Sequence, residues 1–537
     1  MLWIALHLPT LSLESFAATL ASSADPAAAE RPIALLEAHR IVSANAAAQA
    51  QGVKPGLKRA TALALAPKIV LGQADATRDA AALWPVAHAV LAFTPSVSLQ
   101  PAAETGASSD TVLLEVRASL RYFGGLERLL RCMAAALRPL GHAVRVASAA
   151  TAQGAALLAR VEPPPQCLDL AATRHALEGA PVWLLGPGRE HWEALQGMGL
   201  RQLGDLLGLP RAGLARRFGE AMLAEIDAAF GQRPDPREPI VLPPAFESRL
   251  ELFARVDTTE QVLHGAAVLL ERLIAWLSAQ HAFVRRFRLL MHHEARGSSA
   301  AREGDRTPQA TALEIALAEP SRDSAHLLVL LRERLARVQL PAPTLELCLQ
   351  AEDISKRAPP NAELFATTGS EHEGLTRLIE RLQARLGAGQ VQRLVRVQEH
   401  RPERASETRA ADAAGFGQGK SKPIEAKRGP GMAVATGEAG VDAGMMAPRP
   451  VWLQLPEPLA EQGSRPLFEG RPLQLLSGPE RIEAGWWDSA LAGRDYFIAE
   501  AADGALIWIY RERLPLARDA SEGVASGSGW FLHGRFG

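Results

Sequence analysis

The apolar positions of the first 172 residues follow two alternating spacings. In residues 2–8 every second side chain is a leucine or isoleucine, and this period predicts a buried β-strand. Strand-like segments recur at 33–36, 112–116 and 143–147, and Ala- and Leu-rich helical segments lie at 44–50, 60–66 and 126–137. Such an alternation is typical of an α/β or α+β domain.

Residues 173–240 change to short helices separated by glycines. The segment Leu184-Leu185-Gly186-Pro187-Gly188, followed by Arg189 and a helix to Leu195, has the layout of a helix–hairpin–helix motif. Two glycines in such a turn expose backbone N–H groups, which bind a DNA phosphate. A glycine-containing turn between two core helices has the same sequence pattern, so both interpretations stay open.

A βαββαβ order is predicted for residues 241–355. Its strands are expected at 248–256, 284–292, 312–317 and 344–351, and its amphipathic helices at 259–279 and 322–338. This order is typical of an α+β sandwich in which both helices pack on one face of the sheet.

Three further segments follow the sandwich. Residues 356–400 contain a loop and a helix, whereas residues 401–450 lose nearly all large apolar side chains, which predicts a disordered linker. Aromatic residues return in 451–537, where two alternating segments flank Asp503-Gly504 as in a β-hairpin. We expect a small β-rich domain here, with the aromatic side chains in its core.

The composition narrows the possible function classes. Of the 537 residues, 58 are Lys or Arg and 59 are Asp or Glu, so a polyanionic partner requires a local basic patch. The three cysteines are far apart and form no CxxC pair, which argues against a disulfide scaffold or a thiolate zinc site and fits a reducing cytosol. No positive residue precedes the apolar N-terminal segment, and His7, Pro9 and Glu14 interrupt it. We therefore expect neither a signal peptide nor a membrane span.

Together these segments resemble a Y-family translesion DNA polymerase. Residues 44–70, ANAAAQAQGVKPGLKRATALALAPKIV, follow the fingers pattern of that family, and Arg121-Tyr122-Phe123-Gly124-Gly125 is a further match. The resemblance covers residues 1–350. It implies a multidomain α+β architecture with palm and fingers at 1–172, a helix–hairpin–helix thumb at 173–240 and a little finger at 241–355.

The positions that bind metal ions in that family are degenerate in this chain. Nucleotidyl transfer requires carboxylates that hold two divalent cations. The two aspartates of the family's first strand correspond to Ala5 and His7, and the residue that excludes ribonucleotides corresponds to Thr10. In the second metal-binding element Asp110 is retained, whereas Thr111 replaces a glutamate. With one carboxylate of three, we expect no metal, no cofactor and no polymerase activity.

The triphosphate contacts of the family are missing as well. Its fingers tyrosine and arginine correspond to Ala46 and Gln49, and no lysine lies between Lys68 and Lys356 to bind phosphate. The chain thus resembles the catalytically inactive members of the family that occur in bacterial mutagenesis cassettes, as do its C-terminal segments GWWD, RDYFIAE and WFLHGRFG.

This resemblance implies a cytoplasmic, nucleoid-associated adaptor in error-prone translesion synthesis and DNA repair. The implied partners are damaged or primer–template DNA, the sliding clamp (beta subunit), a RecA-like accessory protein and a C-family error-prone polymerase. Residues 451–537 are expected to bind partners.

Clamp-binding peptides are extended segments that end in Leu-Phe and insert into an apolar pocket. Two segments of the chain have this ending. We favour Asn361-Ala362-Glu363-Leu364-Phe365, because it follows Ala358-Pro359-Pro360 in an expected loop. Arg249-Leu250-Glu251-Leu252-Phe253 alternates like the buried face of a strand, so we expect it to lie in the core.

DNA contacts are expected from the thumb turn (Gly186, Gly188, Arg189) and from the little finger (Arg286, Arg288). Arg286 and Arg288 share one face of a strand. Such contacts bind phosphates and not bases, so binding should weaken with salt and show little sequence preference. A solvated strand face is the alternative interpretation of these arginines.

Two other functions remain open. A divergent active polymerase would use Asp110 and Glu115 together with another carboxylate. A protein-interaction module would keep the fold without binding DNA. Primer extension distinguishes the first from an adaptor, and DNA binding across a range of salt distinguishes the second.

Overall fold

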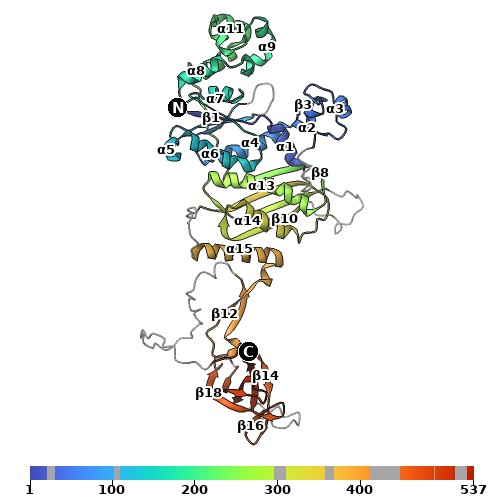
Figure 1. The fold of residues 1–537 in the computed structure, drawn as a ribbon, viewed down its shortest axis with the longest axis vertical. Coiled ribbons are helices and arrows are strands. Elements are labelled where there is room, and N and C mark those ends of the chain that lie inside the picture. Colours follow the sequence, from blue (N-terminus) through green and yellow to red (C-terminus); the bar gives the residue numbers. More distant parts are fainter. Residues whose placement is uncertain are drawn as a thin grey trace. The chain divides into compact units, whose positions relative to one another are not determined.

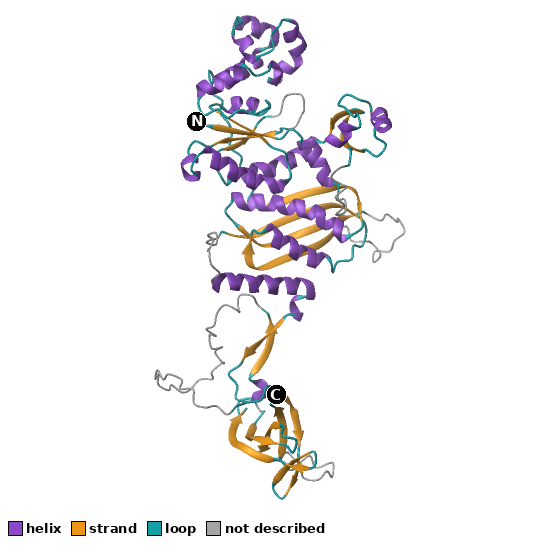
Figure 2. Ribbon diagram, viewed as in Figure 1, coloured by secondary structure: helices purple, strands orange, loops and turns teal. Residues whose placement is uncertain are grey.

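The computed structural model describes residues 1–20, 31–101, 109–294, 310–356, 368–411, 448–488, 490–513 and 529–536. Its contacts divide the chain into two units, Met1–Gly387 and Ala388–Gly537. The first unit combines several sheets with helices, and the second consists mainly of strands (Figures 1 and 2). The expected multidomain α+β fold with a β-rich C-terminal part is therefore confirmed.

A four-stranded antiparallel sheet forms the centre of the palm segment, in the order β5-β6-β1-β7. Its strands are β5 (Val97–Leu99), β6 (Thr111–Glu115), β1 (Trp3–His7) and β7 (Arg145–Ala149). Alternate side chains of β1 enter two different cores. Ile4 and Leu6 pack with helices α4 (Ala76–Leu91) and α6 (Leu126–Leu137), and Ala5 packs with α7 (Ala152–Leu158). The short α5 (Leu120–Phe123) and the 3-10 turn η2 (Arg138–Leu140) flank α6.

A three-stranded sheet carries the fingers segment, in the order β3 (Arg40–Ala44), β2 (Ile33–Glu37) and β4 (Val70–Gln73), with helices α2 (Ala46–Ala50) and α3 (Arg59–Leu65). It packs on α1 (Leu11–Thr19) of the palm through Phe16. A Cβ atom at Gly72 would lie 2.5 Å from this aromatic ring. Glycine at position 72 therefore permits the close approach of α1 to β4.

The thumb segment consists of short helices: α8 (Leu170–Glu178), η3 (Val182–Leu184), α9 (Gly186–Gly197), α10 (Leu203–Leu207), α11 (Arg211–Phe218) and α12 (Glu220–Ala229). Leu185, Leu195 and Phe218 lie in a core that continues into the α7 face of the palm sheet. This shared core fixes the turn at the start of α9 relative to α7 and α12.

The little finger has the predicted βαββαβ order. Its sheet runs β10-β9-β11-β8, from β8 (Phe246–Val256), β9 (Phe283–His293), β10 (Ala310–Ser321) and β11 (Thr344–Ser355). Helices α13 (Thr259–Ala279) and α14 (Ser324–Leu335) cover one face (Figure 2). The sequence therefore predicted both the order of the elements and the face that the helices cover.

Helix α13 is long and apolar enough to span a membrane, but over half of its most apolar window is buried inside the protein. One side packs on the little-finger sheet, and Ala275 on another side enters the core of the palm helices. This is the environment of a core helix.

Helix α15 (Thr368–Leu386) follows β11 and packs on α14.

The second unit has a five-stranded sheet in the order β14-β21-β20-β19-β18. Its strands are β14 (Trp452–Pro458), β21 (Trp530–Arg535), β20 (Leu506–Glu512), β19 (Ala492–Glu500) and β18 (Gln474–Ala484), with a small sheet of β15 (Ala460–Gln462), β16 (Arg465–Phe468) and β17 (Arg471–Pro472). Tyr496, Trp508 and Trp530 are buried, as expected for core aromatics. Trp486 and Trp487 are exposed, so the expected core role is wrong for these two.

The boundary of the predicted linker also differs from the structure. A hairpin of β12 (Gln392–Arg396) and β13 (Ser406–Ala410), with the 3-10 turn η5 (Pro402–Arg404), extends beyond residue 401. Arg401 is buried and donates hydrogen bonds to Asp488 at 3.1 and 2.7 Å and to Glu399 at 2.7 Å. Residues 401–411 are therefore held by contacts with a segment that begins 87 residues further along the chain. The rest of the predicted linker, 412–447, lies outside the described residues.

We expect Leu252→Ala to lower the free energy of unfolding by about 2–5 kcal/mol, because it leaves a cavity in the little-finger core. Leu252 is 6% exposed. Denaturant unfolding of the variant measures the loss. Glu251→Ala, at the exposed neighbouring position, should change stability by no more than about 0.5 kcal/mol. Equal effects of the two substitutions would contradict the burial of Leu252.

Candidate functional site

The carboxylate predicted to survive from the metal site lies where β1 ends and β6 begins. In the register of these strands His7 is opposite Thr111, and Ala5 is opposite Leu113. Asp110 immediately precedes β6, so it lies beside His7. Ala5 is fully buried in the core under α7. The structure thus brings together His7, Asp110 and Thr111, whereas Ala5, two residues earlier on the same face of β1, packs in the core.

Asp110 is surrounded by hydrogen-bond donors. Arg160 lies just beyond the end of α7, and its Nη2 is 2.9 Å from Oδ1 of Asp110. The hydroxyl of Thr111 donates to the same oxygen at 2.7 Å, and Nδ1 of His7 lies 3.5 Å from it. A guanidinium, a hydroxyl and an imidazole therefore surround one carboxylate oxygen of Asp110.

These neighbours determine the charge state of Asp110. Burial raises the pKa of its carboxyl, but the hydrogen bond with His7 and the positive charge of Arg160 lower it further than burial raises it. The net pKa lies well below the ordinary range, so Asp110 is ionised at neutral pH. Its negative charge is compensated inside the protein.

This arrangement lacks the ligands that a two-metal site needs. In the described part of the chain no group of three or more His, Cys, Asp or Glu side chains is placed to hold a metal ion. Arg160, which the sequence interpretation missed, forms an ion pair with Asp110. Arg160 is the only basic residue between Arg145 and Arg174. Its isolation in the sequence is the feature that could have marked it as the partner of Asp110.

Glu115, the second carboxylate of the alternative polymerase, lies at the other end of β6. It is opposite Trp3 in the strand register, and its Oε1 accepts the backbone N–H of Leu2 at 3.1 Å. At about 3.3 Å per residue, the five residues from Asp110 to Glu115 separate these carboxylates by roughly 16 Å. Two metal ions that share ligands lie only about 4 Å apart, so this pair does not form a site.

The fingers helix α2 presents no cation at the predicted triphosphate position. Ala46 lies in its first turn, and the amide of Gln49 donates to the carbonyl of Ala44 at 2.6 Å. In the palm, the side-chain oxygen of Gln153 on α7 accepts a hydrogen bond from Arg237 at 2.9 Å. Arg237 is itself paired with Asp235 at 2.7 Å.

The thumb turn has an internal partner that the sequence did not reveal. The backbone N–H of Gly186 donates to Oε2 of Glu225 on α12 at 3.0 Å, and Oε1 of Glu225 accepts from Gln153 at 2.8 Å. The role of Gly186 as a phosphate donor stays a prediction, and in this structure its N–H donates to a carboxylate of the protein. Gly188 and Arg189 lie in the first turn of α9, and their side-chain surroundings are not described.

The predicted arginines of the little finger are exposed on the sheet face that the helices leave uncovered. Arg286 and Arg288 share this face, and both pair with Glu314 on β10, at 3.3 and 3.4 Å. On β8 Arg249 pairs with Glu247 at 2.8 Å and lies 3.7 Å from Glu346. Three arginines thus meet three glutamates. The pairing of β10 with β9 places Glu314 opposite Arg288. The sequence of β9 alone did not predict this acidic partner.

The favoured clamp-binding segment, Asn361-Ala362-Glu363-Leu364-Phe365, lies outside the described residues. The other segment belongs to strand β8, where it pairs with β11. Leu250 and Leu252 are buried in the core, whereas Phe253 is 51% exposed and its ring lies 5.0 Å from that of Phe16. Leu250–Phe253 is therefore part of the sheet, as the alternation predicted.

The comparisons with known proteins agree with the predicted class. Residues 11–160 match the model of the impB/mucB/samB family. The matched segment thus defines a domain similar to the impB/mucB/samB family, and within it Asp110 is paired with Arg160 and lies beside His7.

Over most of its length the chain is similar to Protein ImuB of Caulobacter vibrioides (strain NA1000 / CB15N). The two are 28% identical over 504 residues, which cover 90% of this chain and 100% of that protein. Protein ImuB of a second strain, ATCC 19089 / CIP 103742 / CB 15, matches with the same identity and coverage. The resemblance inferred from the sequence motifs is thus confirmed.

Solved structures matched by the fold include a Dbh ternary complex, with 16% identity and a TM-score of 0.35. An insertion ternary complex of Dbh DNA polymerase has a TM-score of 0.36, and DinB from Sulfolobus solfataricus has 0.34, both at 16% identity. Each match covers 66% of this chain and 99% of the solved chain.

We expect Asp110→Asn to lower the free energy of unfolding at pH 7 by about 1–2 kcal/mol, because a partly exposed charge-assisted hydrogen bond contributes roughly that amount. Folding lowers the pKa of Asp110, so its contribution is present above the ordinary carboxyl pKa of about 4 and is lost as pH falls below it. Denaturant unfolding at pH 7 and pH 3 measures this.

The difference between the wild type and Asp110→Asn should therefore shrink at pH 3. The matched control is Asp257→Asn at an exposed position, which should have little effect at either pH. A difference that stayed constant between pH 7 and pH 3 would contradict an ionised, internally paired Asp110.

Proposed function

We propose that the protein is a non-catalytic adaptor in error-prone translesion DNA synthesis and DNA repair. The observation that carries this proposal is the pairing of Asp110 with Arg160, His7 and Thr111. A carboxylate that is already neutralised by a guanidinium binds a divalent cation poorly, and its predicted companions are His7 and Thr111, which are not carboxylates. The similarity to ImuB and the family domain at 11–160 support this role.

The proposed partners follow from the same resemblance. Damaged or primer–template DNA would contact the thumb turn and the exposed face of the little-finger sheet. The sliding clamp would bind residues 361–365.

ImuA, the RecA-like accessory protein, and a C-family error-prone polymerase would bind the β-rich second unit. Its exposed Trp486 and Trp487 are candidates for such contacts, because exposed aromatic side chains are frequent anchors of protein interfaces. We place the protein in the cytoplasm, at the nucleoid.

A protein-interaction module that does not bind DNA is the second candidate. It is favoured by the occupied N–H of Gly186 and by the balanced charges around Arg286 and Arg288. DNA binding measured across a range of salt separates the two candidates. The adaptor requires measurable affinity that weakens as salt rises.

We expect no template-dependent primer extension by the purified full-length protein with Mg²⁺ or Mn²⁺ and all four dNTPs. The reason is that, among the residues that the structure describes, no group of carboxylates beside Asp110 is placed to hold two cations. Extension is measured on a labelled primer–template, with an active polymerase as a positive control. Extension that Asp110→Ala abolished would establish a divergent active polymerase instead.

We expect Glu314→Gln to tighten DNA binding several-fold, because it releases Arg286 and Arg288 from an internal carboxylate. Each arginine that gains a phosphate should steepen the plot of log affinity against log salt by about 0.9, so two arginines add up to about 1.8. Fluorescence anisotropy with primer–template DNA at several salt concentrations measures both quantities.

Glu352→Gln is the matched control, since it removes one exposed negative charge from the same sheet and Glu352 takes part in no ion pair within the described residues. It should change affinity only slightly and leave the salt slope unchanged. If Glu314→Gln behaved like this control, Arg286 and Arg288 would not be DNA contacts.

For the clamp, we expect Leu364→Ala combined with Phe365→Ala to abolish pull-down by the sliding clamp. The two side chains would otherwise fill the apolar pocket that receives clamp peptides. The control is Asn361→Ala in the same segment, which should retain most binding. Unchanged binding of the double variant would move the clamp site elsewhere in the chain.

A further inference from the structure

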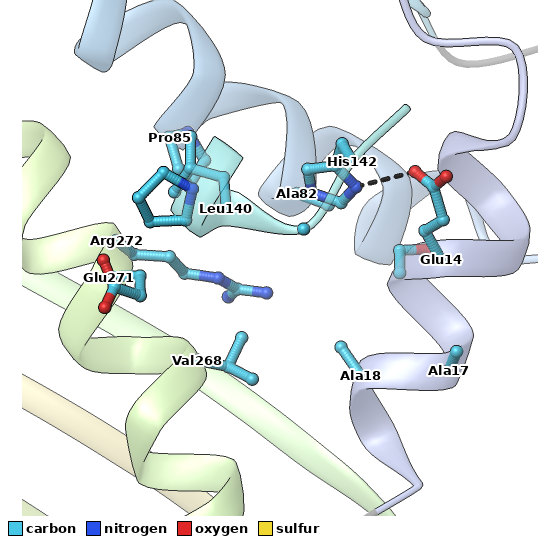
Figure 3. A pocket seen from close by; sticks show the side chains of 13 residues that line it. Glu14, Ala17, Ala18, Ala82, Pro85, Leu140, His142, Val268, Glu271 and Arg272 are labelled. Atoms are coloured by element: carbon cyan, nitrogen blue, oxygen red, sulfur yellow. Dashed lines mark hydrogen bonds and ion pairs between the residues drawn. The ribbon is translucent and has the colours of Figure 1, made fainter. Parts of the chain in front are cut away.

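A cavity of about 290 Å³ lies between the palm and the little finger, and its lining includes neither Asp110 nor Arg286 (Figure 3). Helices α1 and α4 and the loop after η2 form its palm side, and α13 forms its little-finger side. Its walls are mainly apolar, from side chains that include Ala17, Ala18, Ala82, Pro85, Leu140 and Val268. A volume near 300 Å³ is at the lower end of the range for small-molecule sites.

Arg272 of α13 is the arginine that lines this cavity. The residue is 7% exposed, and its guanidinium extends toward α1, into the space between Val268, Ala18 and His142 (Figure 3). Its Nη1 donates to the hydroxyl of Ser248 and to the carbonyl of Arg249, both at 3.2 Å. Both acceptors are neutral, and within the described residues Arg272 forms no ion pair with a carboxylate.

A buried guanidinium without a counter-ion is unusual, because taking a charge out of water costs free energy unless an opposite charge compensates it. Burial lowers the pKa of Arg272 to about 10, so the side chain still carries its charge at neutral pH. The planar fork of an arginine binds a carboxylate or phosphate through two parallel hydrogen bonds.

The two acidic residues of the cavity do not supply this counter-ion. Glu14 accepts hydrogen bonds from Thr10 at 2.6 Å and from the backbone N–H of Ala143 at 3.1 Å, and it lies 3.0 Å from Nδ1 of His142. Glu271 points away from the guanidinium (Figure 3), and burial raises the pKa of its carboxyl. Both carboxylates would repel a dianion, so the site favours an anion with a single charge.

We propose that this cavity is a binding site for a small organic monocarboxylate with an apolar body. The carboxylate would pair with the guanidinium of Arg272, and the apolar body would lie against Ala18, Pro85 and Val268. Because the walls belong to α1, α4 and α13, the ligand would contact both the palm and the little finger. The proposal concerns a second site and is independent of the adaptor function.

Benzoate is the probe for this site, and ligand-observed NMR with the full-length protein measures its dissociation constant. Benzyl alcohol has a similar shape without the charge, and inorganic phosphate supplies an anion without the apolar body. We expect benzoate to bind at least tenfold more tightly than either. Equal binding of benzyl alcohol would exclude the role of Arg272, and equal binding of phosphate would exclude the monocarboxylate class.

Two variants test the location of the site. Arg272→Gln keeps a hydrogen-bonding side chain but removes the charge, and it should weaken benzoate binding at least tenfold. Ala18→Leu leaves Arg272 unchanged and fills the cavity from the α1 side, so it should also weaken binding. Folding of each variant is checked by circular dichroism. Wild-type affinity in a folded Arg272→Gln or Ala18→Leu protein would overturn the proposal.

Discussion

The function proposed for this protein depends on the ion pair between Asp110 and Arg160. A carboxylate at the end of β6 can compensate a metal ion or a guanidinium, and its neighbour His7 is an imidazole where a two-metal site needs a second carboxylate. The surrounding palm sheet is intact, with both faces covered by apolar cores. The palm sheet that would present a catalytic site is therefore retained, while the charge of Asp110 is balanced inside the protein. This combination supports the proposed role of the protein as a scaffold that binds other proteins.

Internal carboxylates also occur at the positions proposed to contact DNA. Glu225 accepts the N–H of Gly186 in the thumb turn, and Glu314 pairs with Arg286 and Arg288 on the little-finger sheet. A phosphate that binds at either place has to displace a protein anion, so part of the Coulomb energy of binding is lost. Under the proposed function, contact with DNA would therefore be weak and sensitive to salt. Such contact suits an adaptor that is positioned mainly by protein partners.

A few specific side-chain contacts hold together segments that are far apart in the sequence. Phe16 of α1 packs against Gly72 of the fingers and against Phe253 of the little finger, so one aromatic ring contacts three parts of the first unit. In the second unit, Arg401 joins the hairpin segment to Asp488 after a separation of 87 residues. Neither contact follows from local propensity, because both join residues that are far apart in the chain.

The sequence by itself determined the order of the elements and the family resemblance, and it predicted that Ala5, His7 and Thr111 replace carboxylates. These properties are local: they depend on the period of apolar residues and on the identity of single side chains. Only the tertiary structure showed that His7, and not Ala5, lies beside Asp110, and that Arg160, Glu225 and Glu314 occupy the charged groups nearby. Strand register and helix packing bring these residues together across 39 positions of sequence in the thumb and across 50 and 103 positions in the palm, and no local pattern encodes such pairings.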